Sequence, residues 1–264
     1  MNIAHTLRDT LRASCRGARV RDVRIGITYI AVQLEDNRTG VAYTQGTERS
    51  RGCSLFLNRR PLAGRPAEEL LDLLDSSVLL ERCVGLATAN AVANVPRTLE
   101  ESTDVLEVLS LTARDTVAMI GFFQPLVPTL KRKVGSLKIF EAHGDYSDVV
   151  RPADEAHEFL LASDVALITS TTIANRTLER LLKAAERCRE VVLLGSSTPL
   201  VVEAFQKTPI TLLSGITIND PEGILRLVSE GGGTRFFKPF VTKVNIPVRL
   251  MHRSDEGSVG ACGL

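Results

Sequence analysis

The sequence lacks paired cysteines and paired histidines. Its five cysteines are an odd number, lie far apart and never form a CxxC pair, which argues against a disulfide framework and a zinc ribbon. The four histidines are equally dispersed, and neither an HxH nor an HxxxH pair occurs. Soft-metal coordination therefore lacks its usual ligands. We expect Cys83, in an apolar helical stretch, and Cys188, near a helix end, to be buried as small hydrophobes.

Neither an excess of charge nor a long apolar run is present. The 32 basic and 31 acidic residues give a net charge of +1, so the strongly basic face of a nucleic-acid-binding protein is not expected. No apolar run approaches the roughly 18 residues that span a bilayer. Residues 1–14 lack the apolar core of a signal peptide and instead place Ile3, Leu7 and Leu11 on one helix face. We therefore expect a cytoplasmic protein that binds neither nucleic acid nor membrane.

The motifs of two large enzyme classes are also missing. The sequence contains neither the GxGxxG fingerprint, which brings a dinucleotide pyrophosphate close to the backbone, nor the GxSxG nucleophile elbow of hydrolases. Phe122 and Phe123 occupy the turn of 121–126, where the fingerprint would place glycines. A dinucleotide held in the usual way is therefore disfavoured. The aromatic pair could wall a pocket or could belong to the core.

The first hundred residues predict a small α+β domain, 1–100. Alternating or apolar runs predict strands at 23–34, 41–44 and 53–57. Helical periodicity predicts helices at 67–74 and 79–94, and the second helix is apolar almost all round, so it should be buried. Residues 95–104 carry a proline, several charges and no apolar periodicity, which predicts the boundary to a second domain.

A repeating strand–helix pattern follows in the second domain, 101–264. Apolar runs begin near residues 117, 137, 165, 191 and 210, at intervals of roughly twenty to thirty residues. Helical segments are predicted between and after them, at 126–133, 154–161, 175–188, 199–206 and 221–229. Strands that are apolar on both faces predict a parallel sheet covered by helices on both sides. The expected fold class is therefore α/β, a small α+β domain followed by a Rossmann-like, doubly wound parallel sheet. Residues 235–246 could add an edge strand or a closing flap.

Two consecutive strand ends carry more hydroxyl groups than usual. Each apolar run stops at a hydroxyl-rich turn, 169–175 or 195–199, and a helical pattern follows. Thr172 and Thr198 are placed to cap those helices. Since capping needs only one hydroxyl per turn, the surplus favours contact with a ligand beyond the carboxyl ends of the strands. The expected contact residues are Thr169, Ser170, Thr171, Thr172, Asn175, Gly195, Ser196, Ser197, Thr198 and Pro199.

Carboxylates and amides supply further candidate residues. Glu141 ends a predicted strand twenty residues after Gly121, the spacing at which Rossmann-type sites place an acid on a ribose hydroxyl. Asp145, in the following loop, is a second candidate, and either residue could instead be a solvated loop carboxylate. Asn90 and Asn94 share one face of the buried helix. They either hydrogen-bond a neighbouring backbone or line a cleft to the second domain.

Four segments, GLATANAVAN, GFFQPL, STTIANRTLERLL and GSSTPL, occur in this order over nearly the whole chain. With the two-domain plan they resemble a prokaryotic family named for putative heavy-metal chelation, which joins an enolase-N-terminal-like domain to a Rossmann-like domain. The resemblance implies a ligand site in the cleft between the domains. Its lining would be Asn90, Gly121, Phe122, Phe123, Pro125, Glu141 and the two hydroxyl turns. Any metal would be held by oxygen donors such as Glu141 and Asp145, or by a chelating small molecule that the protein binds.

The leading hypothesis is a cytoplasmic protein that binds a small anionic or metal-chelating ligand in that cleft, with a divalent metal or metal chelate as the candidate cofactor. The alternative is an enzyme, a transferase that binds a nucleoside such as S-adenosylmethionine at the same place, with Glu141 or Asp145 as general base. A third hypothesis is a purely structural or partner-binding protein. Independently of function, the N-terminal domain could supply a surface for a homo-oligomer. The sequence leaves enzyme and binding protein open.

Overall fold

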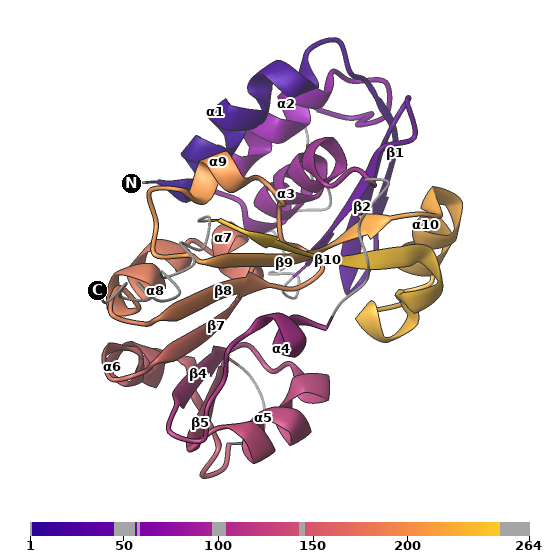
Figure 1. Cartoon of the computed structure of the whole chain (residues 1–264). Coiled ribbons are helices and arrows are strands. Elements are labelled where there is room, and N and C mark those ends of the chain that lie inside the picture. The colour runs from indigo at the N-terminus through magenta and orange to yellow at the C-terminus, as the bar shows by residue number, and fades with distance from the viewer. Residues whose placement is uncertain (1, 45–55, 57–58, 97–103, 143–145, 249–264) are drawn as a thin grey trace, which may run out of the picture.

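Two sheets organise the chain. The computed structural model describes residues 2–44, 56, 59–96, 104–142 and 146–248. Within these ranges a three-stranded antiparallel sheet precedes a seven-stranded, mostly parallel sheet (Figure 1). The expected fold class, a small α+β unit followed by a doubly wound sheet, is confirmed. The strand predicted at 53–57 lies outside the described residues, apart from Phe56.

The N-terminal unit consists of a small sheet with helices packed against it. Its strands, in the order β1-β2-β3, are antiparallel. As the sequence predicts, Ile3, Leu7 and Leu11 of the first helix are buried. The elements are α1 (Ile3–Cys15), β1 (Val20–Ile25), β2 (Tyr29–Leu34), β3 (Thr39–Tyr43), α2 (Ala67–Leu71), the 3-10 helix η1 (Asp72–Asp75) and α3 (Leu79–Ala93).

The single strand predicted over 23–34 is wrong, because a tight turn divides it into β1 and β2. The amide of Gly26 donates a hydrogen bond to the carbonyl of Tyr29, 2.9 Å away. Gly26 also lies directly against a later helix, where a Cβ atom would stand 2.2 Å from the carbonyl oxygen of Val228. Ile25 and Ile27 continue the apolar alternation across the turn, which hides it in the sequence.

The larger sheet has the strand order β10-β9-β8-β7-β4-β5-β6, and only the pair β9–β10 is antiparallel. From β4 the chain moves outward through β5 and β6, then returns to the other side of β4 through β7, β8 and β9. This reversal between β4 and β7 is the switch point of a doubly wound sheet. The strands are β4 (Thr116–Ile120), β5 (Ser136–Glu141), β6 (Val150–Pro152), β7 (Val165–Thr169), β8 (Glu190–Leu194), β9 (Leu212–Ile218) and β10 (Val241–Pro247).

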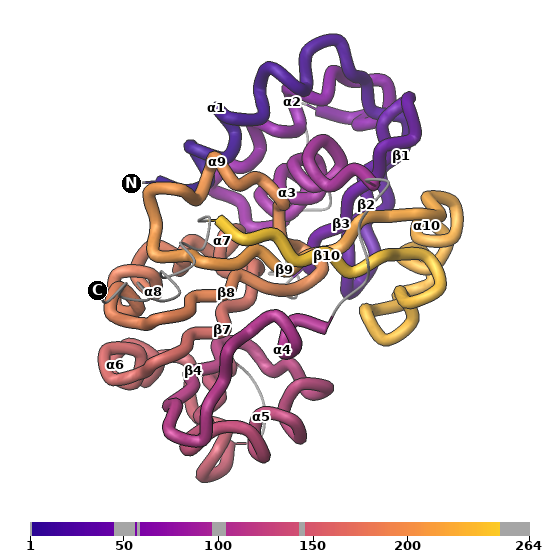
Figure 2. The backbone as a smooth tube through the Cα atoms, viewed as in Figure 1, coloured from indigo at the N-terminus to yellow at the C-terminus, as the bar shows by residue number. Residues whose placement is uncertain are grey.

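Helices cover both faces of this sheet (Figure 2). On one face α4 (Val105–Val108) and α5 (Val127–Lys133) pack against side chains such as Met119 and Leu167. On the other face α6 (Ala156–Leu161), α8 (Leu178–Ala184) and α9 (Val202–Phe205) share a core with the helices of the N-terminal unit. The helix α10 (Pro221–Ser229) packs against β1 and β2. One continuous core therefore joins the two parts of the chain.

Two predicted helices are shorter than expected, and the structure decides between the two alternatives for a third segment. The helix predicted from residue 175 begins only at Leu178, because a separate short helix α7 (Thr171–Ala174) precedes it and Arg176 has a left-handed φ of 61°. The helix predicted from Pro199 is reduced to α9. Of the two alternatives for 235–246, the edge strand is correct, as β10, and it follows the 3-10 turns η4 (Thr234–Phe236) and η5 (Lys238–Phe240). Within the described ranges, no helix is both long and apolar enough to cross a membrane.

Candidate functional site

The switch point of the large sheet brings three strand ends together. Gly121 follows β4 with φ 90°, and Gly195 follows β8 with φ 121°, both in the left-handed region that favours glycine. A Cβ atom on Gly121 would lie 3.0 Å from the Cβ and Cγ2 atoms of Thr169, at the end of β7. A Cβ atom on Gly195 would lie 3.4 Å from the hydroxyl of Ser170. Two glycine turns thus flank the Thr169–Ser170 turn.

The ring of Phe123 lies across these turns. Its Cε2 atom is 3.6 Å from the position of a Cβ on Gly121, and its Cε1 atom is 3.7 Å from that position on Gly195. The side chain is half-buried and packs against the core on the α4–α5 face. Its neighbour Phe122 is 50% exposed. We name Gly121, Phe123, Thr169, Ser170 and Gly195 the switch-point cluster.

The first hydroxyl turn uses part of its hydroxyls internally. The hydroxyls of Thr169 and Thr171 are 3.1 Å apart, and the hydroxyl of Thr172 donates to the carbonyl of Thr169. The expected helix cap at Thr172 is wrong, because α7 already begins at Thr171. Ser170 is completely buried, and its hydroxyl has no hydrogen-bond partner among the described residues. Asn175 is exposed, and its side-chain oxygen accepts hydrogen bonds from the amide and hydroxyl of Thr177.

The second hydroxyl turn lies mostly beneath the N-terminal unit. Ser197, Thr198 and Pro199 are buried, whereas Gly195 and Ser196 are half-buried. The hydroxyl of Ser197 accepts a hydrogen bond of 2.9 Å from the backbone amide of Tyr43 in β3. The expected cap at Thr198 is wrong, since the following helix begins only at Val202, and the buried Thr198 hydroxyl has no partner within the described ranges.

Tyr29 connects the N-terminal sheet to this turn, and sequence reasoning missed it. Its phenol lies beside Ser196 and Thr234, and burial raises its pKa above the ordinary tyrosine value. Its ring makes edge-on contacts with Tyr43, at a centroid distance of 5.5 Å, and with Phe237, at 4.9 Å. In the sequence Tyr29 is only the first residue of an apolar run. A tyrosine in a buried strand usually needs a partner for its hydroxyl, and that signal was available.

The two asparagines of α3 have different surroundings. Asn94, which caps the helix, donates to the carbonyls of Thr198 and Ile216 and accepts from the amide of Leu200, at 2.8–3.2 Å. Asn90 donates to the carbonyl of Val41, and its buried side-chain oxygen has no partner among the described residues. Asn94 therefore fastens α3 to the turn after β8.

Glu141 lies beside the switch-point cluster, but its carboxylate is already engaged. One oxygen accepts from the amide of Phe122 at 2.9 Å, and the other accepts from the amide of Ala142 at 2.8 Å. Pro125, on the same turn as Phe122, is exposed. The second expected carboxylate, Asp145, lies outside the described residues.

The donor set of the described residues does not fit a directly bound heavy metal. No group of three or more His, Cys, Asp or Glu side chains gathers within the described part of the chain. Cys15, Cys83 and Cys188 are buried, which confirms the expectation for the last two. Burial raises the pKa of Cys83 to about 12 and that of Cys15 and Cys188 to about 11. Because the thiolate is the form that binds metal, these neutral thiols are poor ligands.

Peptide mapping after alkylation with iodoacetamide at neutral pH tests this burial. We expect Cys15, Cys83 and Cys188 to remain unmodified in the native protein and to react fully in urea. Because folding raises their pKa, their neutral thiols stabilise the fold below the ordinary value of 9.0, and this contribution falls as the pH rises from 9 towards 11 or 12. Rapid native alkylation of any of the three thiols would contradict the assignment.

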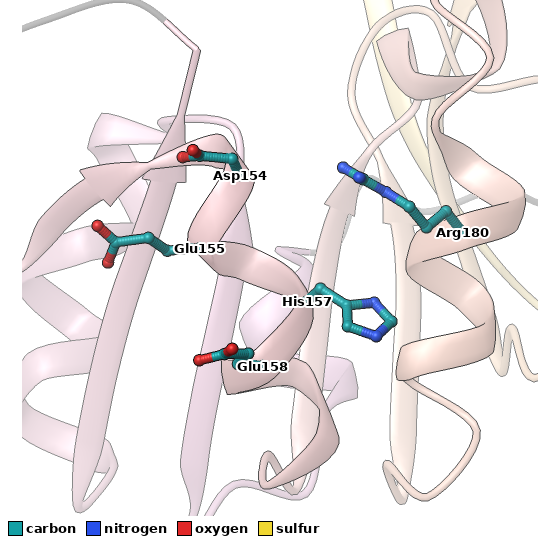
Figure 3. A pocket seen from close by; sticks show the side chains of 5 residues that line it. All are labelled: Asp154, Glu155, His157, Glu158 and Arg180. Carbon is teal, nitrogen blue, oxygen red and sulfur yellow. The ribbon is translucent and has the colours of Figure 1, made fainter.

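Two grooves of the described surface lie away from the switch-point cluster. The larger, about 430 Å³, is lined by Asp154, Glu155, His157, Glu158 and Arg180 between α6 and α8. Figure 3 shows His157 and the guanidinium of Arg180 on facing sides, while Glu155 and Glu158 point away from Arg180. The smaller groove, about 220 Å³, runs along α10 and Phe240. Neither groove contains a predicted site residue.

Comparisons with known proteins agree on one family. Residues 104–247 and residues 8–93 match two family models that share the description "putative heavy-metal chelation". An uncharacterized protein of Methanocaldococcus jannaschii is 27% identical over 239 residues, which cover 87% of this chain and 90% of the relative.

Two crystal structures of proteins of unknown function from the family of the first model share the fold. The structure from Pyrococcus horikoshii superposes with a TM-score of 0.81 at 22% identity and covers 93% of this chain and 99% of its own. The structure from Desulfitobacterium hafniense has a TM-score of 0.76 at 22% identity and covers 92% and 98%.

Proposed function

Because the chain belongs to the family described as putative heavy-metal chelation, we propose that it binds a metal-chelating small molecule, not a bare metal ion, at the switch-point cluster. One observation carries the proposal: two left-handed glycine turns flank a hydroxyl pair where the strand order reverses. Doubly wound sheets bind their ligands outside the carboxyl ends of the strands at this point. The glycines let the side chains of Thr169, Ser170 and Phe123 pack against the two turns, and the ligand would lie on the surface that these side chains form.

The borders of the cluster suit an organic ligand. Phe122 and Phe123 offer apolar surface, and Thr169, Thr171 and Ser196 offer half-buried hydroxyls within the same set of turns. Apolar walls with a few placed polar groups are typical of small-molecule sites. The N-terminal unit reaches this region through Tyr43, whose backbone amide donates to the hydroxyl of Ser197. The ligand would therefore lie between the two units, with its own donor atoms holding the metal.

A melting series separates chelate binding from direct metal binding. The probes are Zn²⁺ and Cd²⁺ alone, citrate alone and the citrate complexes of both metals. We expect a complex to raise the Tm by about 5 °C at saturating concentration, since a ligand at a hundred times its Kd adds about 2.7 kcal/mol to stability. The bare ions should leave Tm within error. A stabilisation by the bare ions equal to that by their complexes would refute this proposal.

Gly121→Ala should weaken binding of the best probe at least about tenfold, a change of 1.4 kcal/mol. The new Cβ would stand 3.0 Å from Thr169 and 3.6 Å from the ring of Phe123, and would displace these two side chains, which form the proposed ligand surface. Gly17→Ala is the matched control, because Gly17 also has a positive φ, 77°, but no atom within 4 Å of its Cβ position. Both variants carry the conformational cost of alanine at positive φ, about 1–2 kcal/mol. Equal ligand affinity in the two variants would place the site elsewhere.

A second candidate function is a transferase that binds a nucleoside such as S-adenosylmethionine at the same cluster. The observation that favours it is Glu141, which ends β5 beside β4 and keeps free lone pairs on both carboxylate oxygens after accepting the amides of Phe122 and Ala142. A ribose hydroxyl could donate to one of them. Isothermal titration with S-adenosylmethionine tests this function, and the absence of heat at millimolar ligand would reject it.

A further inference from the structure

We infer that Phe123 is the specificity-determining residue of the switch-point cluster and that it excludes phosphate-bearing ligands. This inference rests on the proposed function for its location. It goes further by assigning the ligand class: the group that enters the cluster carries no phosphate.

The position of the ring supports the assignment. In a doubly wound sheet, the turn after the first strand is where glycines let a pyrophosphate approach the backbone. Here the ring atoms of Phe123 lie 3.6 Å from the Cβ position of Gly121 and 3.7 Å from that of Gly195. The ring therefore spans both glycine turns and takes up the volume that a phosphate would need.

Glu141 also disfavours the binding of a phosphate group at this turn. Its carboxylate accepts the backbone amide of Phe122, which is one of the donors that this turn could offer to an anion. The carboxylate also adds a negative charge beside the turn, and that charge repels a phosphate group. No lysine or arginine occurs in the turns 121–126, 169–175 and 195–199 to offset it. The bulk of the Phe123 ring and the charge of Glu141 therefore both disfavour binding of a phosphate group.

The remaining polar groups fit the uncharged part of a ligand. The hydroxyls of Thr169, Thr171 and Ser196 are half-buried, and each can both donate and accept a hydrogen bond. Such groups suit the hydroxyl and amide groups of a nucleoside-like or polyol-like molecule. The class assigned here is therefore a ligand with a hydroxyl-bearing or amide-bearing part and a flat part that packs on Phe123.

Isothermal titration with inorganic pyrophosphate, ADP and adenosine tests the role of Phe123. We expect Phe123→Ala to bind pyrophosphate and ADP at least about tenfold more tightly than wild type, equivalent to 1.4 kcal/mol, and Phe123→Ala/Glu141→Gln to gain more. Phe122→Ala is the matched comparison, because it removes the same ring one residue earlier without opening the space between the glycines. It should show no gain for pyrophosphate.

Phe123→Leu is the control for a folding defect in Phe123→Ala, because leucine keeps an apolar side chain packed on the core while it removes the ring. It should show a smaller gain in pyrophosphate binding than Phe123→Ala. If the folded Phe123 variants bind pyrophosphate no more tightly than Phe122→Ala, the inference is overturned. Adenosine and the metal–citrate complexes report on the proposed function separately, because wild type can bind them whether or not Phe123 excludes phosphate.

Discussion

Asn94→Ala is expected to lower the free energy of unfolding by about 3–5 kcal/mol. The substitution leaves three buried backbone groups without a hydrogen-bond partner, and each such group costs about 1–3 kcal/mol. Asn94 is 5% exposed and satisfies the carbonyls of Thr198 and Ile216 and the amide of Leu200. A methyl group at this position can replace none of these hydrogen bonds. Urea unfolding followed by circular dichroism measures the change.

Asn219→Ala is the matched control for this variant. Asn219 is exposed, and its amide donates to the hydroxyl of Thr242 at 2.7 Å. Its loss should cost less than about 1 kcal/mol, since surface substitutions are usually close to neutral. If Asn94→Ala and Asn219→Ala destabilise equally, α3 is not fastened to the β8 turn in the way described.

Gly40→Ala should have a comparable effect, about 3 kcal/mol, for a steric reason. A Cβ atom on Gly40 in β3 would lie 2.1 Å from the amide nitrogen of Ala91 and 2.3 Å from the carbonyl oxygen of Ala87. These are backbone atoms of α3, so the whole helix must shift, and overpacking of this kind costs about 1–3 kcal/mol or more. Urea unfolding again gives the value.

The control for Gly40→Ala is Gly233→Ala. Gly233 lies in a loop before η4, and no atom stands within 4 Å of its Cβ position. Alanine there should leave stability within about 0.5 kcal/mol of wild type. Because α3 carries Asn94 as its cap, Gly40→Ala and Asn94→Ala should also be non-additive. Near-neutral behaviour of Gly40→Ala would mean that β3 and α3 are not in direct contact.

The sequence predicts the larger sheet well because its signals are local. The runs of residues 165–168 and 191–194 are apolar on both faces, which only strands covered on both sides tolerate. The helix Pro221–Ser229 begins and ends as predicted, with Asp220 accepting the amide of Gly223 at its start. The turn between β1 and β2 was missed because its glycine, Gly26, is required by close packing against Val228, about two hundred residues away in the sequence.

The candidate site was predictable in position but not in its internal contacts. Gly121, Thr169 and Gly195 follow neighbouring strands, and parallel strands end at the same edge, so their proximity follows from the topology. Whether a hydroxyl faces a ligand or the N-terminal unit depends on packing between distant segments. Ser197 bonds to the amide of Tyr43, a residue 154 positions earlier. No pattern within the turn itself contains that information.

The two hydroxyl turns, which were both expected to contact a ligand, have different surroundings in the structure. The turn at Thr169–Ser170 belongs to the switch-point cluster, whereas Ser197 and Thr198 lie under the N-terminal unit and contribute to holding it. The ligand proposal therefore depends on the glycines beside the hydroxyls as much as on the hydroxyls themselves.

Native mass spectrometry of the purified protein, after incubation with a small-molecule extract of its source organism, tests the central claim most directly. The account predicts one organic ligand that carries a metal ion, retained by wild type and by Gly17→Ala and lost from Gly121→Ala. A wild-type spectrum with only the bare polypeptide, or with a metal ion and no organic mass, would contradict it.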